Sequence, residues 1–201
     1  MAESYQFIFI FLLILTTAVE FYLGHRQKNF VSKNKKKVPS AFTKIIKLAD
    51  HKKAADYTVS KINFNSIELI FGAIILYLFT LGGGISLMND LMGQHFENPL
   101  LNGAVIITSI FVALHLIGIP SAIYQTFVIE TKYGFNKITP KLFFTDQIKS
   151  VIIMILLSIV VSFAALWILS ELGNEWWLWL WIFLSVLSLI GVALAPVLKQ
   201  L

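Results

Sequence analysis

Four histidines and a few carboxylates are the residues of this 201-residue sequence that could bind a metal ion or transfer a proton. There is no cysteine, which excludes disulfides, thiolate metal ligands and a cysteine nucleophile. The histidines are His25, His51, His95 and His115; none stands four residues from another, and none directly precedes a glutamate. A zinc hydrolase of the HExxH type needs two histidines on one helical face and the intervening glutamate as general base. The sequence therefore predicts no catalytic residue and no metal ligand.

Three ionisable side chains lie in or beside long apolar stretches. His115 falls inside one of them, and Glu20 and Glu68 lie near the ends of two others. An ionisable group at membrane depth is a functional candidate by default, because leaving it unpaired in hydrocarbon is costly. We expect His115 to form a hydrogen bond to a neighbouring span. Glu20 and Glu68 are expected at the interface or facing the bundle, where together they could line a polar cavity.

The composition identifies the kind of structure that must position these groups. Hydrophobic residues make up 57% of the chain and charged residues only 13%, which is typical of an integral membrane protein. A helix needs roughly 20 apolar residues to cross about 30 Å of hydrocarbon, and five stretches qualify. We predict an all-α polytopic membrane helical bundle that forms a single membrane domain over residues 1–201. The predicted spans cover approximately residues 5–24, 67–88, 104–124, 148–169 and 176–198.

The distribution of lysine and arginine predicts the orientation. Eleven lie between Gly24 and Ile67, four lie between Thr126 and Lys149, and none lies in the other two loops. The positive-inside rule places the two basic loops in the cytoplasm, the N-terminus outside and the C-terminus on the cytoplasmic side. This arrangement would put His95 outside and two of the other histidines inside, so three histidines could not meet at one metal ion.

The first basic loop, residues 25–66, is long enough to contain structure of its own. A basic tract at Lys33–Lys37 precedes Pro39, after which apolar residues recur at three- and four-residue steps. This spacing predicts an amphipathic cytoplasmic helix that lies on the membrane surface or packs against a cytoplasmic partner. The lysines suit anionic lipid of the bilayer. Because no aromatic residues are interleaved with them, we expect no nucleic-acid partner.

The second basic connector contains signals for a tight turn between two helices. Gly134 is placed for a left-handed position after a helix that ends near Lys132. Thr139 and Pro140 are typical of an N-cap followed by the first residue of a new helix. Glu130, Asp146 and Lys149 lie near the predicted hydrocarbon boundary, where charged groups need partners. Such a rigid turn either ties the two spans together, or it docks a cytoplasmic element or lines a cavity.

Two stretches carry a family resemblance. "VIETKYGFNKITPKLFFTDQIKS" resembles the connector between spans in type I CAAX prenyl proteases, which are integral-membrane zinc metalloendopeptidases. "VPSAFTKIIKLADHKKAADYTVSKINF" resembles the segment after the first span of the same family. The two matches occur in the right order and, with the spans around them, cover nearly the whole chain.

The resemblance implies a function that this chain performs only in part. Members of the family bind zinc through an HExxH helix and a more distant glutamate, and this sequence lacks both histidines of that motif. "LAPVLKQL" at its end resembles the point where the family's cytoplasmic metal domain begins. By resemblance, the chain is the N-terminal membrane part, inactive alone, which forms an intramembrane chamber for prenylated or membrane-associated substrates. It would dock a zinc-peptidase domain that follows Leu201.

By the same resemblance, the connector would face that domain and supply positioning contacts. The candidate docking and structural residues are Glu130, Tyr133, Gly134, Phe135, Asn136, Lys137, Thr139, Asp146 and Lys149. An alternative hypothesis is a non-catalytic membrane scaffold or binding protein that retains only this region. A small transporter is a third hypothesis, but the sequence shows no inverted repeat.

Overall fold

The chain is helical almost throughout. The computed structural model describes residues 2–93 and 95–198. Among these residues there is no strand, and five helices are long and apolar enough to cross a membrane, which confirms the predicted fold class. The long helices are α1 (Ala2–Asn34), α2 (Leu48–Thr80), α4 (Pro99–Tyr124), α6 (Pro140–Glu171) and α7 (Trp176–Leu198). The short elements are η1 (Ser40–Phe42), α3 (Gly84–Met92), η2 (Gln125–Glu130), α5 (Thr131–Tyr133) and η3 (Gly173–Glu175).

These helices form two compact units. The first comprises Met1–Ser86 and Leu116–Phe144, and the second comprises Leu87–His115 and Thr145–Leu201. Each unit therefore combines segments that are distant in the sequence. The behaviour of residues 1–201 as a single membrane domain stays a prediction.

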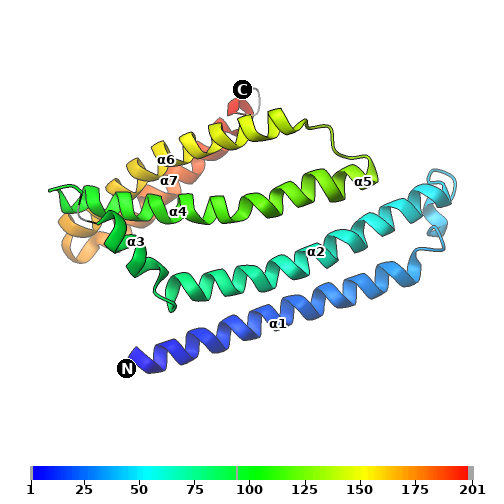
Figure 1. Cartoon of the computed structure of the whole chain (residues 1–201), viewed down its shortest axis with the longest axis horizontal. Helices are drawn as coiled ribbons and strands as arrows, with labels where there is room; N and C mark the ends of the chain where they lie inside the picture. The colour runs from blue at the N-terminus through cyan, green and yellow to red at the C-terminus, as the bar shows by residue number, and fades with distance from the viewer. Residues whose placement is uncertain (1, 94, 199–201) are drawn as a thin grey trace. The chain divides into compact units, whose positions relative to one another are not determined.

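In the first unit, α1 and α2 run antiparallel as a hairpin (Figure 1). A Cβ atom added to Gly24 would lie 3.7 Å from Ile62 Cγ2 and 3.9 Å from Ser66 Oγ, so the two helices touch at this level. Small residues permit such close approach between membrane helices. The hairpin is the rigid element on which the connector after α4 rests.

The predicted cytoplasmic loop of residues 25–66 is mostly helical. Helix α1 continues to Asn34, past the predicted end of its span, and α2 already begins at Leu48. The predicted amphipathic helix and the second span are therefore one continuous helix. The physical reason is that no proline or glycine lies between Pro39 and Gly72, so nothing interrupts the backbone hydrogen bonds.

The second span ends earlier than predicted. Helix α2 stops at Thr80, and the chain turns at Gly83, whose φ of +85° is one that residues other than glycine rarely adopt. Helix α3 then starts at Gly84, where a Cβ atom would lie only 2.7 Å from Phe79 Cα. The glycine run is thus a tight turn between helices.

In the second unit, α4 and α6 lie side by side. A Cβ atom on Gly103 would lie 2.7 Å from Leu166 Cδ1, and Ser158 Oγ donates a hydrogen bond to Thr108 Oγ1 at 3.0 Å. Residue numbers rise along one helix as they fall along the other, so the helices are antiparallel. Hydroxyl pairs and small residues of this kind are typical of contacts between membrane helices.

The helix that leads to the connector changes its winding before it ends. Helix α4 contains Pro120, and the segment η2 that follows it is π-helical over Gln125–Glu130. A π-helical turn holds more residues than an α-helical turn and is common at functional sites. The irregularity in this helix thus lies between Pro120 and the connector.

Candidate docking site

The turn after α5 has the geometry that its sequence predicts. Gly134 adopts the left-handed conformation with φ 74° and ψ 23°. The backbone N–H groups of Phe135 and Asn136 both donate to the carbonyl of Glu130, at 2.9 and 3.2 Å. These bonds satisfy a carbonyl that the helix end would otherwise leave unpaired. These local hydrogen bonds hold the turn in shape without a contact from another protein.

The start of α6 is capped as predicted. The N–H of Leu142 donates to Thr139 Oγ1 at 3.3 Å, and Pro140 is the first helical residue. Between the two caps, Asn136 Oδ1 accepts the N–H of Ile138 at 2.7 Å, and its Nδ2 donates to Thr131 Oγ1 at 3.0 Å. An asparagine that bonds the backbone two residues on stabilises a turn locally. Asn136 thus organises the connector itself.

Glu130 is held by two residues of α2. Tyr57 Oη donates to Glu130 Oε1 at 2.6 Å, and Lys61 Nζ lies 4.0 Å from the same oxygen. The carboxylate side chain is 21% exposed, so its phenol partner offsets part of the cost of removing it from water. Although 73 residues separate Tyr57 and Glu130, the bond ties the π-helical segment to the hairpin.

Tyr133 is one of the few buried residues in the described part of the chain, at 8% exposure. Its Oη donates to the carbonyl of Asp56 at 3.0 Å and lies 2.7 Å from Ser60 Oγ. Because the phenol has one proton, Ser60 is the donor in the second bond. The Tyr57 ring packs edge-on against the rings of Tyr133 and Phe135, with centroids 5.4 and 4.8 Å apart.

These contacts form one group between α2 and the connector. We call it the connector cluster, and it consists of Tyr57, Ser60, Lys61, Glu130, Tyr133 and Phe135.

Cations surround the aromatic rings of the connector cluster. The Nζ atoms of Lys53, Lys61 and Lys132 lie 5.5 to 5.7 Å from the ring centroids of Phe135, Tyr57 and Tyr133. Each is within the range of a cation–π interaction. Glu130 is the carboxylate of the cluster, so three ammonium groups give this surface a positive charge that would attract an acidic partner.

A pocket of about 430 Å³ opens beside the cluster. Ser60, Lys132 and Tyr133 supply polar atoms to it. Phe64 and Tyr124, whose rings stack at 5.2 Å, form part of its apolar wall. Surface with both apolar and cationic character suits a protein segment better than a small polar ligand.

The other predicted site residues do not join this cluster. Lys137 is exposed, and Asp146 and Lys149 are exposed on the part of α6 that belongs to the second unit. Among the described residues neither Asp146 nor Lys149 forms an ion pair. They are available for a partner outside the described chain.

The hydrogen bond expected of His115 is present, and the interfacial or bundle-facing position of Glu20 and Glu68 stays a prediction. His115 Nε2 lies 2.9 Å from Gln147 Oε1 of α6, the predicted hydrogen bond to a neighbouring span. Glu20 and Glu68 line one pocket of about 250 Å³ between α1 and α2.

Each remaining histidine has a separate hydrogen-bond partner: His25 has Asn29, His51 has the carbonyl of Asn34, and His95 has the carbonyl of Leu91. Within the described residues no three histidine or carboxylate side chains could share a metal ion.

Sequence reasoning missed the α2 side of the connector cluster. Tyr57, Ser60 and Lys61 are three or four residues apart, or adjacent, on α2 and so share a face toward the connector. Nothing local distinguishes them from other polar residues of an amphipathic helix. Only their partners, 73 residues away in the sequence, reveal their role.

Fold and site together define a polytopic all-helical membrane protein in which a basic connector is fixed to a long helical hairpin. Comparison with known families refines this class. The family model described as "CAAX prenyl protease N-terminal, five membrane helices" matches residues 27–200. That is most of the sequence, and the chain therefore belongs to this family.

Individual relatives agree with the family model. The CAAX prenyl protease 1 homologs of Dictyostelium discoideum and Oryza sativa are 26% and 27% identical over 98% of this chain. The matches cover 47% and 48% of those relatives, so this chain spans about half of their length. The crystal structure of S. mikatae Ste24p has the same fold, with a TM-score of 0.83 at 22% identity. That match covers 94% of this chain and 45% of Ste24p.

Proposed function

We propose that this chain is the membrane part of a zinc metalloendopeptidase, and that it confines the substrate and docks the catalytic metal domain. The family match carries the proposal, because the curated relatives are named CAAX prenyl proteases. The matched region is about half of their length and contains no HExxH motif. Both facts are explained if the membrane half and the catalytic half of the protein have separate roles.

The zinc ion of the proposed enzyme does not fit this part of the chain. The four histidines have separate hydrogen-bond partners, and no group of three metal-binding side chains occurs among the described residues. A zinc site needs three or four such ligands around one ion. We therefore assign the zinc ligands to a domain that follows Leu201 or joins it from another chain. The proposed substrates of the complete protein are prenylated or other membrane-associated proteins.

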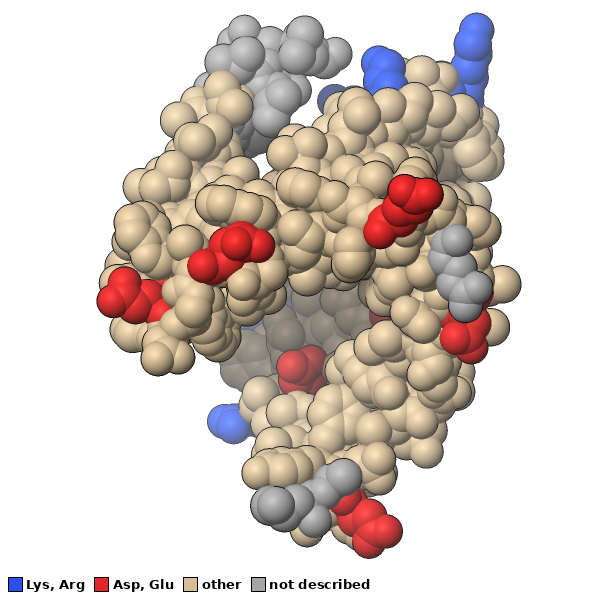
Figure 2. Space-filling view, turned by 90° about the vertical axis from the view of Figure 1, so that its left-hand side faces the viewer, with Lys and Arg blue, Asp and Glu red and all other residues tan. Residues whose placement is uncertain are grey.

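The proposed orientation puts the N-terminus outside and the C-terminus on the cytoplasmic side. The concentration of lysine and arginine in two alternate loops supports it. Figure 2 shows one face of the chain, with aspartate and glutamate side chains in red and lysine and arginine side chains in blue. Because the chain has no cysteine, single cysteines at Lys137 and Asn174 would report the orientation without background. A membrane-impermeant thiol reagent applied from outside should label only the Asn174→Cys variant.

The connector is the proposed docking platform for the metal domain. Its rigid turn, its three ammonium groups and the adjacent mixed pocket support this role. Exposed Lys137 would add a charged contact, while Asn136 would hold the turn in shape. Asp146 and Lys149, which belong to the other compact unit, are proposed as separate charged contacts with the metal domain. A preorganised surface of this kind loses little entropy on binding.

The first experiment is to sequence the coding DNA beyond Leu201. An in-frame continuation with HExxH and a distant glutamate is the expected result. The complete protein should then lose peptidase activity when Lys137 and Lys149 are replaced together by Glu, with binding of zinc unchanged. A stop codon without a neighbouring gene for a metal domain would overturn the enzyme proposal and favour a non-catalytic scaffold.

A further inference from the structure

The helical hairpin of α1 and α2 has two chemically different sides. On one side, Glu20 and Glu68 line the pocket of about 250 Å³. On the other side lies a larger, almost wholly apolar groove of about 860 Å³. Three residues line both the pocket and the groove and so lie between the two sides: Leu13, Thr17 and Ala73. Because carboxylates avoid hydrocarbon, the apolar groove is the side of the hairpin better suited to contact lipid.

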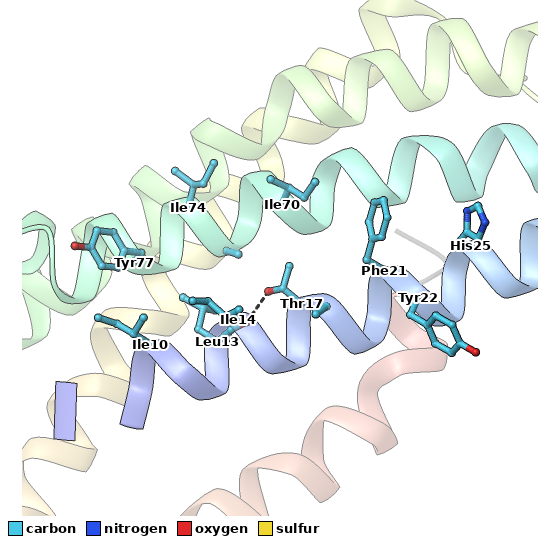
Figure 3. A pocket seen from close by; sticks show the side chains of 12 residues that line it. Ile10, Leu13, Ile14, Thr17, Phe21, Tyr22, His25, Ile70, Ile74 and Tyr77 are labelled. Carbon is cyan, nitrogen blue, oxygen red and sulfur yellow. Dashed lines mark hydrogen bonds between the residues drawn. The ribbon is translucent and has the colours of Figure 1, made fainter. Parts of the chain in front are cut away.

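The groove runs along the hairpin from Ile10 and Tyr77 to His25 (Figure 3). The hydroxyl of Thr17 donates to the carbonyl of Leu13 at 2.7 Å. It therefore needs no hydrogen-bond partner from a molecule bound in the groove. At 1.5 Å per residue, the α1 side from Ile10 to His25 is about 22 Å long. One leaflet of the hydrocarbon core is about 15 Å thick, so an acyl chain that enters at one surface can lie within the groove.

One end of the groove is basic. His25 lines it and lies 2.8 Å from Asn29 Nδ2. Lys28 is three residues beyond His25 and so continues the groove-facing side of α1. It forms no ion pair with any described residue. An apolar groove that ends beside a free cation fits an amphiphile with an anionic head.

We propose that this groove is a binding site for one phospholipid with an anionic headgroup. One acyl chain lies between α1 and α2, and the phosphate is bound by His25 and Lys28. One lysine near a membrane surface gives about a fivefold preference for anionic lipid. The proposal holds for either orientation of the chain, because the headgroup would lie in the leaflet nearest His25. In the proposed orientation this is the cytoplasmic leaflet, which is rich in anionic lipid.

The test compares two lipids that differ only in the headgroup. The full chain is purified in detergent, and phosphatidylglycerol and phosphatidylcholine with identical acyl chains are titrated while bound lipid is counted by native mass spectrometry. We expect one phosphatidylglycerol to bind about five times more tightly than phosphatidylcholine. The variant Lys28→Gln should lose this preference. The control Lys36→Gln removes the same charge from an exposed position beyond the groove and should keep it.

A second pair of variants tests the acyl-chain part of the site. Ala18 lines the groove and its neighbour Val19 does not, although both are exposed. Ala18→Phe should weaken binding of both lipids at least fivefold, while Val19→Phe should leave binding unchanged.

Three results would overturn the proposal. Equal affinity of the unmodified chain for the two lipids would show that the basic end does not select a headgroup. Tighter binding of a farnesylated peptide than of phosphatidylglycerol, lost in Ala18→Phe, would assign the groove to a prenyl chain. A dimer that Ala18→Phe disrupts and that excludes lipid would assign it to a second copy.

Discussion

Replacement of Tyr133 by phenylalanine tests the connector cluster most directly. The ring is buried at 8% exposure and fits phenylalanine without a change in volume. The substitution removes only the hydroxyl that bonds the carbonyl of Asp56 at 3.0 Å and accepts the Ser60 hydroxyl at 2.7 Å. It therefore isolates the polar tie between α2 and the connector from the packing of the rings.

The expected loss follows from these two bonds. A hydrogen bond contributes about 0.5–1.5 kcal/mol net, so two contribute about 1–3 kcal/mol. Ser60 is four residues after Asp56, and its freed hydroxyl can turn back to that carbonyl, which recovers part of the loss. We expect about 1–2 kcal/mol less free energy for opening of the connector. That corresponds to a factor of about 5–30 in the population of the open state.

Amide hydrogen exchange measures this opening. The N–H groups of Gly134, Phe135 and Asn136 are hydrogen-bonded in the turn, and their exchange should accelerate by the same factor. Tyr5→Phe is the control, because Tyr5 is 69% exposed at the start of α1 and its substitution should change nothing. Exchange of the three amides that stays within twofold of the unmodified chain would refute the claim that the hydroxyl ties the connector to α2.

Substitutions at three further positions test the connector and the packing of the second unit. Gly134→Ala should lower the free energy of unfolding by about 1–2 kcal/mol, because alanine is strained in the left-handed conformation. Gly134→Asn should cost less, and equal thermal midpoints for both variants would contradict this account. Glu130→Gln keeps an acceptor for Tyr57 and should cost below about 1 kcal/mol, whereas Glu130→Ala should cost about 1–2 kcal/mol in denaturant titrations. Gly103→Ala places a Cβ atom 2.7 Å from Leu166 Cδ1, which Leu166 must move to relieve, and the better helix propensity of alanine offsets about 1 kcal/mol of that cost. We expect the second unit to lose up to about 2 kcal/mol of stability. In a double-mutant cycle Leu166→Ala should recover part of that loss, and strict additivity would show that the two helices do not meet there.

The sequence by itself determined the features that depend on local chemistry. Five helices long and apolar enough to span a membrane follow from composition, because the backbone must satisfy its own hydrogen bonds in hydrocarbon. The left-handed turn at Gly134 and the cap at Thr139 also followed from the sequence, since each depends on one residue and its neighbours. Boundaries were less accurate. The absence of a helix breaker between Pro39 and Gly72 joined the predicted surface helix and the second span into α2, and the left-handed turn at Gly83 ended α2 early.

Only the tertiary structure decided which of the polar residues act together. Glu130 was expected to need a partner, but nothing in its neighbourhood pointed to Tyr57, which the fold brings within 2.6 Å across 73 residues of chain. Likewise, Asp146 and Lys149 share the connector region in sequence, yet the fold places them in the other compact unit. The two sides of the hairpin, one with Glu20 and Glu68 and one apolar, depend on how α1 and α2 face each other. Helix periodicity fixes which residues share a face, but the rotation of one helix against its neighbour is set by packing between residues distant in sequence.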